Sequence, residues 1–172
     1  DGRFCGLVHQ ADLLGLRAGG AEVLIAAIAA TRDLKGMVLV ADQVRRRGVE
    51  LFNAGMGVDA ICQWMSGLND LIAMRVIELI EDEFDLPWCW LLFGSEGRLE
   101  QTFTTDQDNG LIFEPSNAGD TEALRAAFLP FAQAVNDALH YCGFERCRGG
   151  IMASNPDCCL SSDEWMARFS SW

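Results

Sequence analysis

The sequence is poor in positive charge and has no basic patch long enough to follow a nucleic-acid backbone. Its 172 residues carry 13 Lys and Arg against 25 Asp and Glu, which gives a formal net charge of −12 at pH 7. Proteins that bind duplex or single-stranded nucleic acid neutralise its phosphates with a basic surface. We therefore expect no nucleic-acid partner, and a bound polyphosphate would need metal ions to balance its charge.

Also missing are an apolar run of transmembrane length and an N-terminal signal peptide, so we expect no membrane partner. The seven cysteines are odd in number and form no Cys-x-x-Cys pair. Cys142, Cys147, Cys158 and Cys159 gather toward the C-terminus, but their spacing fits no common zinc pattern. We expect free, mostly buried thiols in a protein of the reducing cytoplasm.

What the sequence does contain is a dense stretch from Trp88 to Glu114, around which the rest is organised. Residues 88–93 are an apolar run without a breaker, which predicts a buried strand. Gly94 and Gly97 then allow the backbone to turn sharply and to approach a ligand closely. Residues 108–114 predict a second strand that pairs with the first.

Two aspartates at the start of the second strand are candidate metal ligands. Side chains alternate between the faces of a strand, so Asp106 and Asp108 point to the same side. Such carboxylates repel each other unless a cation lies between them, and Mg²⁺ commonly shares a site of this kind with substrate phosphates. Solvated acids without a metal would require the glycine turn and the aspartate spacing to coincide by chance.

These motifs resemble those of the DNA polymerase β-like nucleotidyltransferases, in which Gly-Ser precedes Asp-x-Asp by a ten-residue spacer. The longer strings, G-S-E-G-R-L-E-Q at 94–101 and T-D-Q-D-N at 105–109, are similar to a bacterial nucleotidyltransferase family that accompanies CBS and cyclic-nucleotide-binding domains. That family is related to the protein-PII uridylyltransferases and the glutamine synthetase adenylyltransferases. The resemblance also includes residues 149–156 and covers roughly residues 20–172.

The resemblance implies an enzyme that transfers NMP from an NTP to a protein or small-molecule acceptor, with release of pyrophosphate, as a protein-PII uridylyltransferase does. Asp106 and Asp108 would be the catalytic residues and would hold two Mg²⁺ (or Mn²⁺) ions. The nucleotide phosphates would be bound by the glycine turn and the arginine after it: Gly94, Ser95, Gly97 and Arg98.

Some residues near the turn have more than one expected role. Arg98 suits either a bidentate contact with phosphate or an ion pair with Glu96 or Glu100 that fixes the turn. Glu100 and Gln101 are expected behind the metal and phosphate ligands, where they would orient them. Asn109 is expected to bond the backbone beside the metal.

The superfamily also uses a third carboxylate on a later strand, and here its place is open. Glu145 is the one acid in a short segment, 144–147, that suits a third strand, whereas Asp157, Asp163 and Glu164 lie outside any clear strand. Either Glu145 is a third metal ligand, or an acid outside the core serves, or the domain does not turn nucleotide over. In the last case it would be a catalytically weak regulatory module that binds Mg-nucleotide and signals to attached CBS or cyclic-nucleotide domains.

The chain is expected to have three parts. Residues 1–16 contain the string G-L-V-x-x-x-D-L-L, which resembles the end of a CBS domain and otherwise suits a loose chain terminus. Residues 17–87 have helical periodicity, and 88–172 form the expected nucleotidyltransferase core. The fold expected is α+β (α/β), with the helical N-terminal region packed on a small mixed sheet with flanking helices.

Several helix ends can also be predicted. Asp59 is the expected N-cap of the helix before the first strand, and Asp120 that of the helix after the second. Pro130 is expected to kink or split the latter helix, and Gly143 to end it. Ser162 is the expected cap of a last helix.

This last helix carries an apolar stripe of Trp165, Phe169 and Trp172. Such a stripe normally covers a surface, here that of the N-terminal helices, of a following C-terminal domain or of a second copy in a homodimer, or it completes the local core. The expected partners are therefore an NTP, its acceptor, and attached domains on either side.

Overall fold

The computed structural model describes residues 21–81, 84 and 86–171. Residues 1–16, which resemble the end of a CBS domain, lie outside this range. Within it the chain has the expected α+β fold, with N-terminal helices and small mixed sheets. None of the described helices is both long enough and apolar enough to span a membrane.

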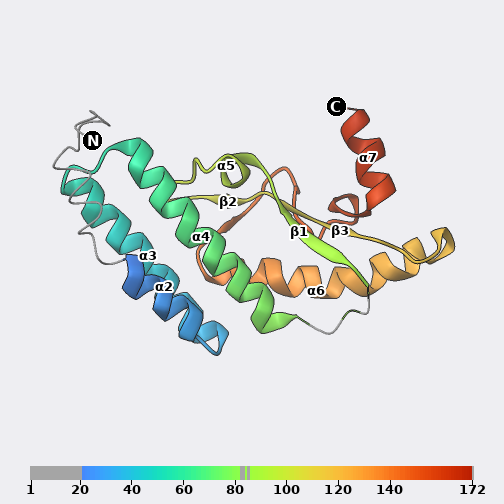
Figure 1. The fold of residues 1–172 in the computed structure, drawn as a ribbon, viewed down its shortest axis with the longest axis horizontal. Helices are drawn as coiled ribbons and strands as arrows, with labels where there is room; N and C mark the ends of the chain where they lie inside the picture. The colour runs from blue at the N-terminus through green and yellow to red at the C-terminus, as the bar shows by residue number, and fades with distance from the viewer. Residues whose placement is uncertain (1–20, 82–83, 85, 172) are drawn as a thin grey trace, which may run out of the picture.

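Three helices build the N-terminal layer: α2 (Ala21–Ala30), α3 (Leu34–Asn53) and α4 (Val58–Ile80). Asp33 begins α3 by accepting the N–H of Gly36 at 2.7 Å. Apolar residues of α3 and α4, including Met37, Val44 and Ile72, are buried in one core. α4 lies between the α2–α3 pair and α6 (Thr121–Tyr141), so it joins the helical layer to the part of the chain that carries the strands (Figure 1).

A three-stranded sheet in the order β1-β3-β5 forms the centre of the C-terminal part. Its strands are β1 (Trp88–Leu92), β3 (Asn109–Phe113) and β5 (Cys159–Ser161). β1 runs antiparallel to β3, with Leu92 opposite Asn109, which confirms that the two predicted strands pair. β5 runs parallel to β3, and the sequence does not predict it because three residues are too few to show a strand period.

A second sheet has two short strands, β2 (Asp106–Gln107) and β4 (Glu145–Arg146), which run parallel. β4 confirms the strand expected within 144–147, but it pairs with β2 and not with the larger sheet. The second predicted strand is thus divided into β2 and β3. Asp108 lies at the division, where the chain passes from one sheet to the other.

The structure corrects the predicted cap of one helix and excludes a split in another. Gly57, not Asp59, is the N-cap of α4, and Asp59 lies in its first turn, where a negative charge still suits the helix dipole. Pro130 does not split α6, which continues to Tyr141 before Gly143 adopts φ +93°. Pro130 and Ala126, whose carbonyl loses its helical partner, are both exposed, so water can satisfy that carbonyl.

The last helix, α7 (Ser162–Ser170), begins one residue earlier than expected. Ser161 is its cap, and Ser161 and Glu164 form a capping box in which each side chain bonds the other's backbone N–H. Trp165 completes the local core: its indole N–H donates to the Leu111 carbonyl at 3.0 Å, and its ring packs on the bare backbone of Gly110. Phe169 stacks on Trp165 but stays 48% exposed, and Trp172 lies outside the described residues.

Replacing Trp165 should destabilise the fold, because its side chain is 2% exposed and its ring packs closely on the backbone of Gly110. We expect Trp165→Ala to lower the free energy of unfolding by about 3–5 kcal/mol, measured by urea denaturation. Met166→Ala is the matched control on the same helix, since Met166 is exposed and should change stability by less than about 0.5 kcal/mol. Equal effects of the two substitutions would contradict the packing described.

Candidate functional site

The end of β1 is held directly beside Asp108. The N–H of Phe93 donates to the Asp108 carbonyl at 2.8 Å, which extends the β1–β3 ladder by one bond. The chain then forms a single helical turn, α5 (Gly94–Gly97), where the sequence predicts a loop. This turn is closed by the N–H of Gly97, which donates to the Phe93 carbonyl at 2.9 Å. Ser95 is half-buried within it.

Glycine is required at both ends of this turn. Gly94 has φ +54°, and a Cβ there would lie 2.1 Å from Oδ2 of Asp108. A Cβ on Gly97 would lie 2.8 Å from the carbonyl oxygen of Leu92. The Asp108 carboxylate therefore rests against bare backbone, and any side chain at position 94 would displace it.

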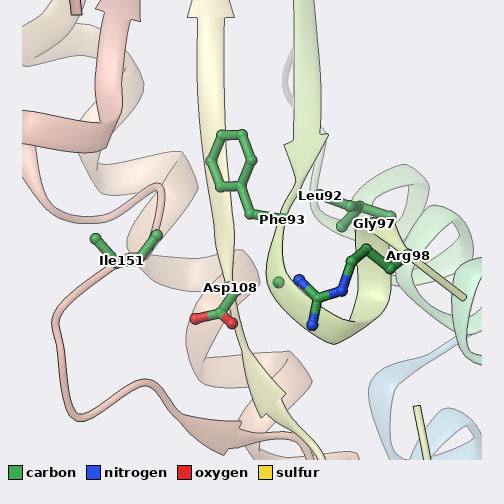
Figure 2. A pocket seen from close by; sticks show the side chains of 7 residues that line it. Leu92, Phe93, Gly97, Arg98, Asp108 and Ile151 are labelled. Atoms are coloured by element: carbon green, nitrogen blue, oxygen red, sulfur yellow. The ribbon is translucent and has the colours of Figure 1, made fainter. Parts of the chain in front are cut away.

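A surface cleft of about 490 Å³ opens beside the turn (Figure 2). This volume falls within the range usual for small-molecule sites. Its lining comes from the end of β1, α5, the β2–β3 junction and a later loop: Leu92, Phe93, Gly94, Gly97, Arg98, Asp108 and Ile151. The site therefore draws on three segments that lie far apart in the sequence.

Arg98 borders this cleft and forms an ion pair with Glu100 at 2.8 Å. Of the two expected partners it is thus Glu100, not Glu96, that Arg98 contacts. Both side chains are largely exposed, and such pairs contribute little to stability. The guanidinium can therefore leave Glu100 for a phosphate at small cost.

Asp106 and Asp108 do converge, and a thiol joins them. Ligand atoms of Asp106, Asp108 and Cys147 all lie within 4.8 Å of one another. Glu145, opposite Asp106 in the ladder, is exposed and is not a member of this group. Cys147 stands two residues after Glu145 and so shares its strand face, which is a signal present in the sequence, although a thiol does not belong to a pattern made of acids alone.

Asn109 anchors the neighbouring loop from inside the protein. Its Oδ1 accepts the backbone N–H of Ala153 at 2.8 Å and an amide N–H of Asn136 at 3.0 Å. Asn136 in turn donates to Oε1 of Gln107 and accepts the N–H of Ser154. The network is buried on β2, β3 and α6, so it fixes the backbone on both sides of Asp108.

Gln101 fixes the segment that leads to Asp106. Its side chain is 1% exposed, accepts from the amide of Asn69 at 2.8 Å and donates to Thr105 Oγ1 at 3.1 Å. Its backbone N–H donates to Ser66 Oγ at 3.2 Å. Gln101 thus ties this segment to α4, whereas the Glu100 side chain faces solvent and pairs with Arg98.

The sequence predicts Glu96 only as an ion-pair partner for Arg98, but the structure buries its side chain instead. Its side chain is 5% exposed, and its Oε1 has no hydrogen-bond partner among the described residues. Burial raises the pKa of Glu96 to about 7, and the nearby carboxylates of Asp70 and Asp108 add to the rise. Oδ1 of Asp70 is likewise buried without a hydrogen-bond partner among the described residues, so both carboxyl groups lie where burial disfavours their charge.

Comparison with known protein families finds a match that includes this arrangement. A family model described as "Putative nucleotidyltransferase DUF294" matches residues 42–172. The matched range contains α4, both sheets and every residue of the cleft and of the Asp106–Asp108–Cys147 group. No curated protein and no solved structure matches the chain.

The buried carboxyl of Glu96 should make stability depend on pH. Because its pKa is higher in the folded protein than the ordinary 4.5, its contribution is complete below about pH 4.5 and is lost as pH rises through about 7. With metal ions removed by a chelator, we expect the free energy of unfolding of Glu96→Gln to exceed that of the wild type at pH 8 by up to about 3 kcal/mol. At pH 4 we expect no such gain.

Denaturant titrations at several pH values measure this effect. Glu100→Gln is the matched control, because it removes the same charge from an exposed position in the same segment. Parallel pH profiles for the wild type and Glu96→Gln would show that Glu96 is not held in an environment that disfavours its charge.

Proposed function

The chain belongs to the family described as "Putative nucleotidyltransferase DUF294", and from this premise we propose that it transfers NMP from an NTP to a protein or small-molecule acceptor. The acceptor oxygen would attack the α-phosphorus, and the bond from that phosphorus to pyrophosphate would break. The observation that carries the proposal is the position of Asp108. Its carboxylate lines the cleft and also belongs to the cluster with Asp106 and Cys147.

The residues present fit a divalent metal of the kind that such an enzyme uses. Carboxylate oxygens are the ligands that Mg²⁺ and Mn²⁺ prefer, and Asp106 and Asp108 offer them within 4.8 Å of each other. Glu96 adds a buried carboxyl group whose Oε1 has no hydrogen-bond partner among the described residues. When bound, the metal would supply positive charge that stabilises the departing pyrophosphate.

The cleft side of Asp108 suits the phosphates. The first N–H groups of the α5 turn have no acceptor within that turn, so they would be able to donate to phosphate oxygens. Ser95 adds a hydroxyl, and Gly97 keeps the turn close to Leu92. Arg98 would exchange Glu100 for a phosphate and hold it with two parallel hydrogen bonds.

The remaining residues would position these groups. Gln101 would hold the segment before Asp106 against α4, and Asn109 would hold the loop that carries Ile151. Neither lines the cleft, so both would act through the backbone that they fix.

One observation favours a second candidate function. No third carboxylate joins Asp106 and Asp108 among the described residues, and a thiol occupies the place beside them. The alternative is therefore a catalytically weak module that binds Mg-nucleotide and signals to attached CBS or cyclic-nucleotide domains. The two functions share the nucleotide site and differ in whether pyrophosphate is released.

Nucleotide binding should depend on both aspartates. We expect Asp106→Asn and Asp108→Asn each to weaken Mg²⁺-dependent NTP binding by more than about a hundredfold, because each removes one carboxylate charge from the metal site. Calorimetry with each of the four NTPs measures this. The thermal unfolding temperature of each variant should be unchanged or slightly higher than that of the wild type, because repulsion between the two carboxylates is relieved.

Asp59→Asn makes the same chemical change at an exposed position on α4 and should leave NTP affinity unaltered. Unchanged NTP affinity in either site variant would refute the assignment of that aspartate.

Turnover should appear as pyrophosphate. We expect the protein, Mg²⁺ and one of the four NTPs to release pyrophosphate when a suitable acceptor is added, and Asp106→Asn to abolish the release. A coupled pyrophosphate assay across candidate acceptor proteins measures this. Tight NTP binding without pyrophosphate from any nucleotide or acceptor would instead support the regulatory module.

A further inference from the structure

Cys147 differs from the other cysteines in where its sulfur lies. Burial raises the thiol pKa of Cys142 to about 11 and that of Cys159 to about 12, as expected for inert core thiols. Cys147 is only half-buried, and its Sγ lies within 4.8 Å of carboxylate oxygens of Asp106 and Asp108. It is the one thiol in such a group among the described residues.

The ladder between β2 and β4 explains this placement. Asp106 is opposite Glu145 in two parallel strands, so the positions two residues further along, Asp108 and Cys147, lie on the same face. The chain then turns back, with the Gly150 N–H donating to the Cys147 carbonyl at 3.1 Å. Cys147 is thus held by backbone geometry at the end of β4, beside the carboxylates.

The surroundings call for a cation. Asp106 and Asp108 are close together, and Glu96, whose carboxyl interacts with that of Asp108, has a buried Oε1 without a hydrogen-bond partner among the described residues. Arg98 lines the cleft that Asp108 also lines, but its guanidinium is already paired with Glu100. Two carboxylates and a sulfur at this spacing form a mixed oxygen and sulfur donor set, which softer divalent ions prefer over Mg²⁺.

We propose that Cys147 supplies the third protein ligand of the metal site, and that the site therefore binds thiophilic divalent cations such as Co²⁺, Zn²⁺ or Cd²⁺ through sulfur. The inference rests on the proposed metal site at Asp106 and Asp108. On binding, the Cys147 S–H bond breaks, its proton passes to solvent, and the thiolate sulfur forms a bond to the metal. Mg²⁺, a hard ion, would bind through the aspartates alone, without a bond to sulfur.

The test is a titration of the full chain with Co²⁺, followed by ultraviolet absorption. We expect a thiolate-to-metal charge-transfer band in the wild type and none in Cys147→Ser, which should bind Co²⁺ and Cd²⁺ about tenfold or more weakly by calorimetry. Mg²⁺ affinity should be the same in both proteins. Cys89→Ser is the matched control, because Cys89 is exposed on β1 and lies outside the group, and it should keep the band.

A second variant guards against a simple loss of fold. Cys147→Asp restores an all-oxygen site, so it should lose the band and bind Mg²⁺ more tightly than the wild type. Wild-type protein that binds Co²⁺ without the band, or Cys147→Ser that keeps it, would overturn the proposal.

The proposed function fails in a different way from this inference. It fails if NTP does not bind in the presence of Mg²⁺, whatever the spectrum shows. Sulfur ligation fails on the spectrum, whatever the affinity for NTP.

Discussion

The contact between the Asp108 carboxylate and the bare backbone of Gly94 constrains the rest of the site. It requires β1 and β3 to pair so that Leu92 is opposite Asn109, because that register places the start of α5 beside Asp108. It requires glycine at position 94, both for its φ of +54° and for the space that a Cβ would fill. It also connects two features, since Asp108 both lines the cleft and belongs to the group with Asp106 and Cys147.

Electrostatics makes this arrangement costly without a ligand. Among the described residues, Asp70 and Glu96 each have a buried carboxyl oxygen without a hydrogen-bond partner, and both have raised pKa values, mainly because burial disfavours their charge. A chain with a net charge of −12 adds no general positive field to compensate. The fold therefore brings several carboxyl groups close together, which packing of the core alone would not favour. Such clusters are typical of binding sites.

The sequence predicts the parts of this protein that depend on local pattern. The apolar runs of β1 and β3, the glycine turn and the aspartate pair can all be recognised from neighbouring residues, and the structure places them together. Features that depend on contacts between residues far apart in the sequence cannot be predicted in this way. β5 is strand-like only because β3 pairs with it, and Pro130 is tolerated in α6 because it lies on the exposed face. Cys147 joins the aspartates only through the pairing of β4 with β2.

The two sides of Asp108 also differ in how firmly they are held. On the metal side, Gln101 ties the chain before Asp106 to α4, and Asn136 of α6 bonds both Gln107 and Asn109, so the carboxylates stand between two buried anchors. On the cleft side, Arg98 and Glu100 are exposed and paired only with each other among the described residues. Rigid ligands suit a metal, which needs fixed distances, whereas a loosely held arginine suits a phosphate that arrives and leaves. In the proposed site the scaffold would thus give preorganisation to the metal and adaptability to the nucleotide, with Asp108 as the residue shared by the two.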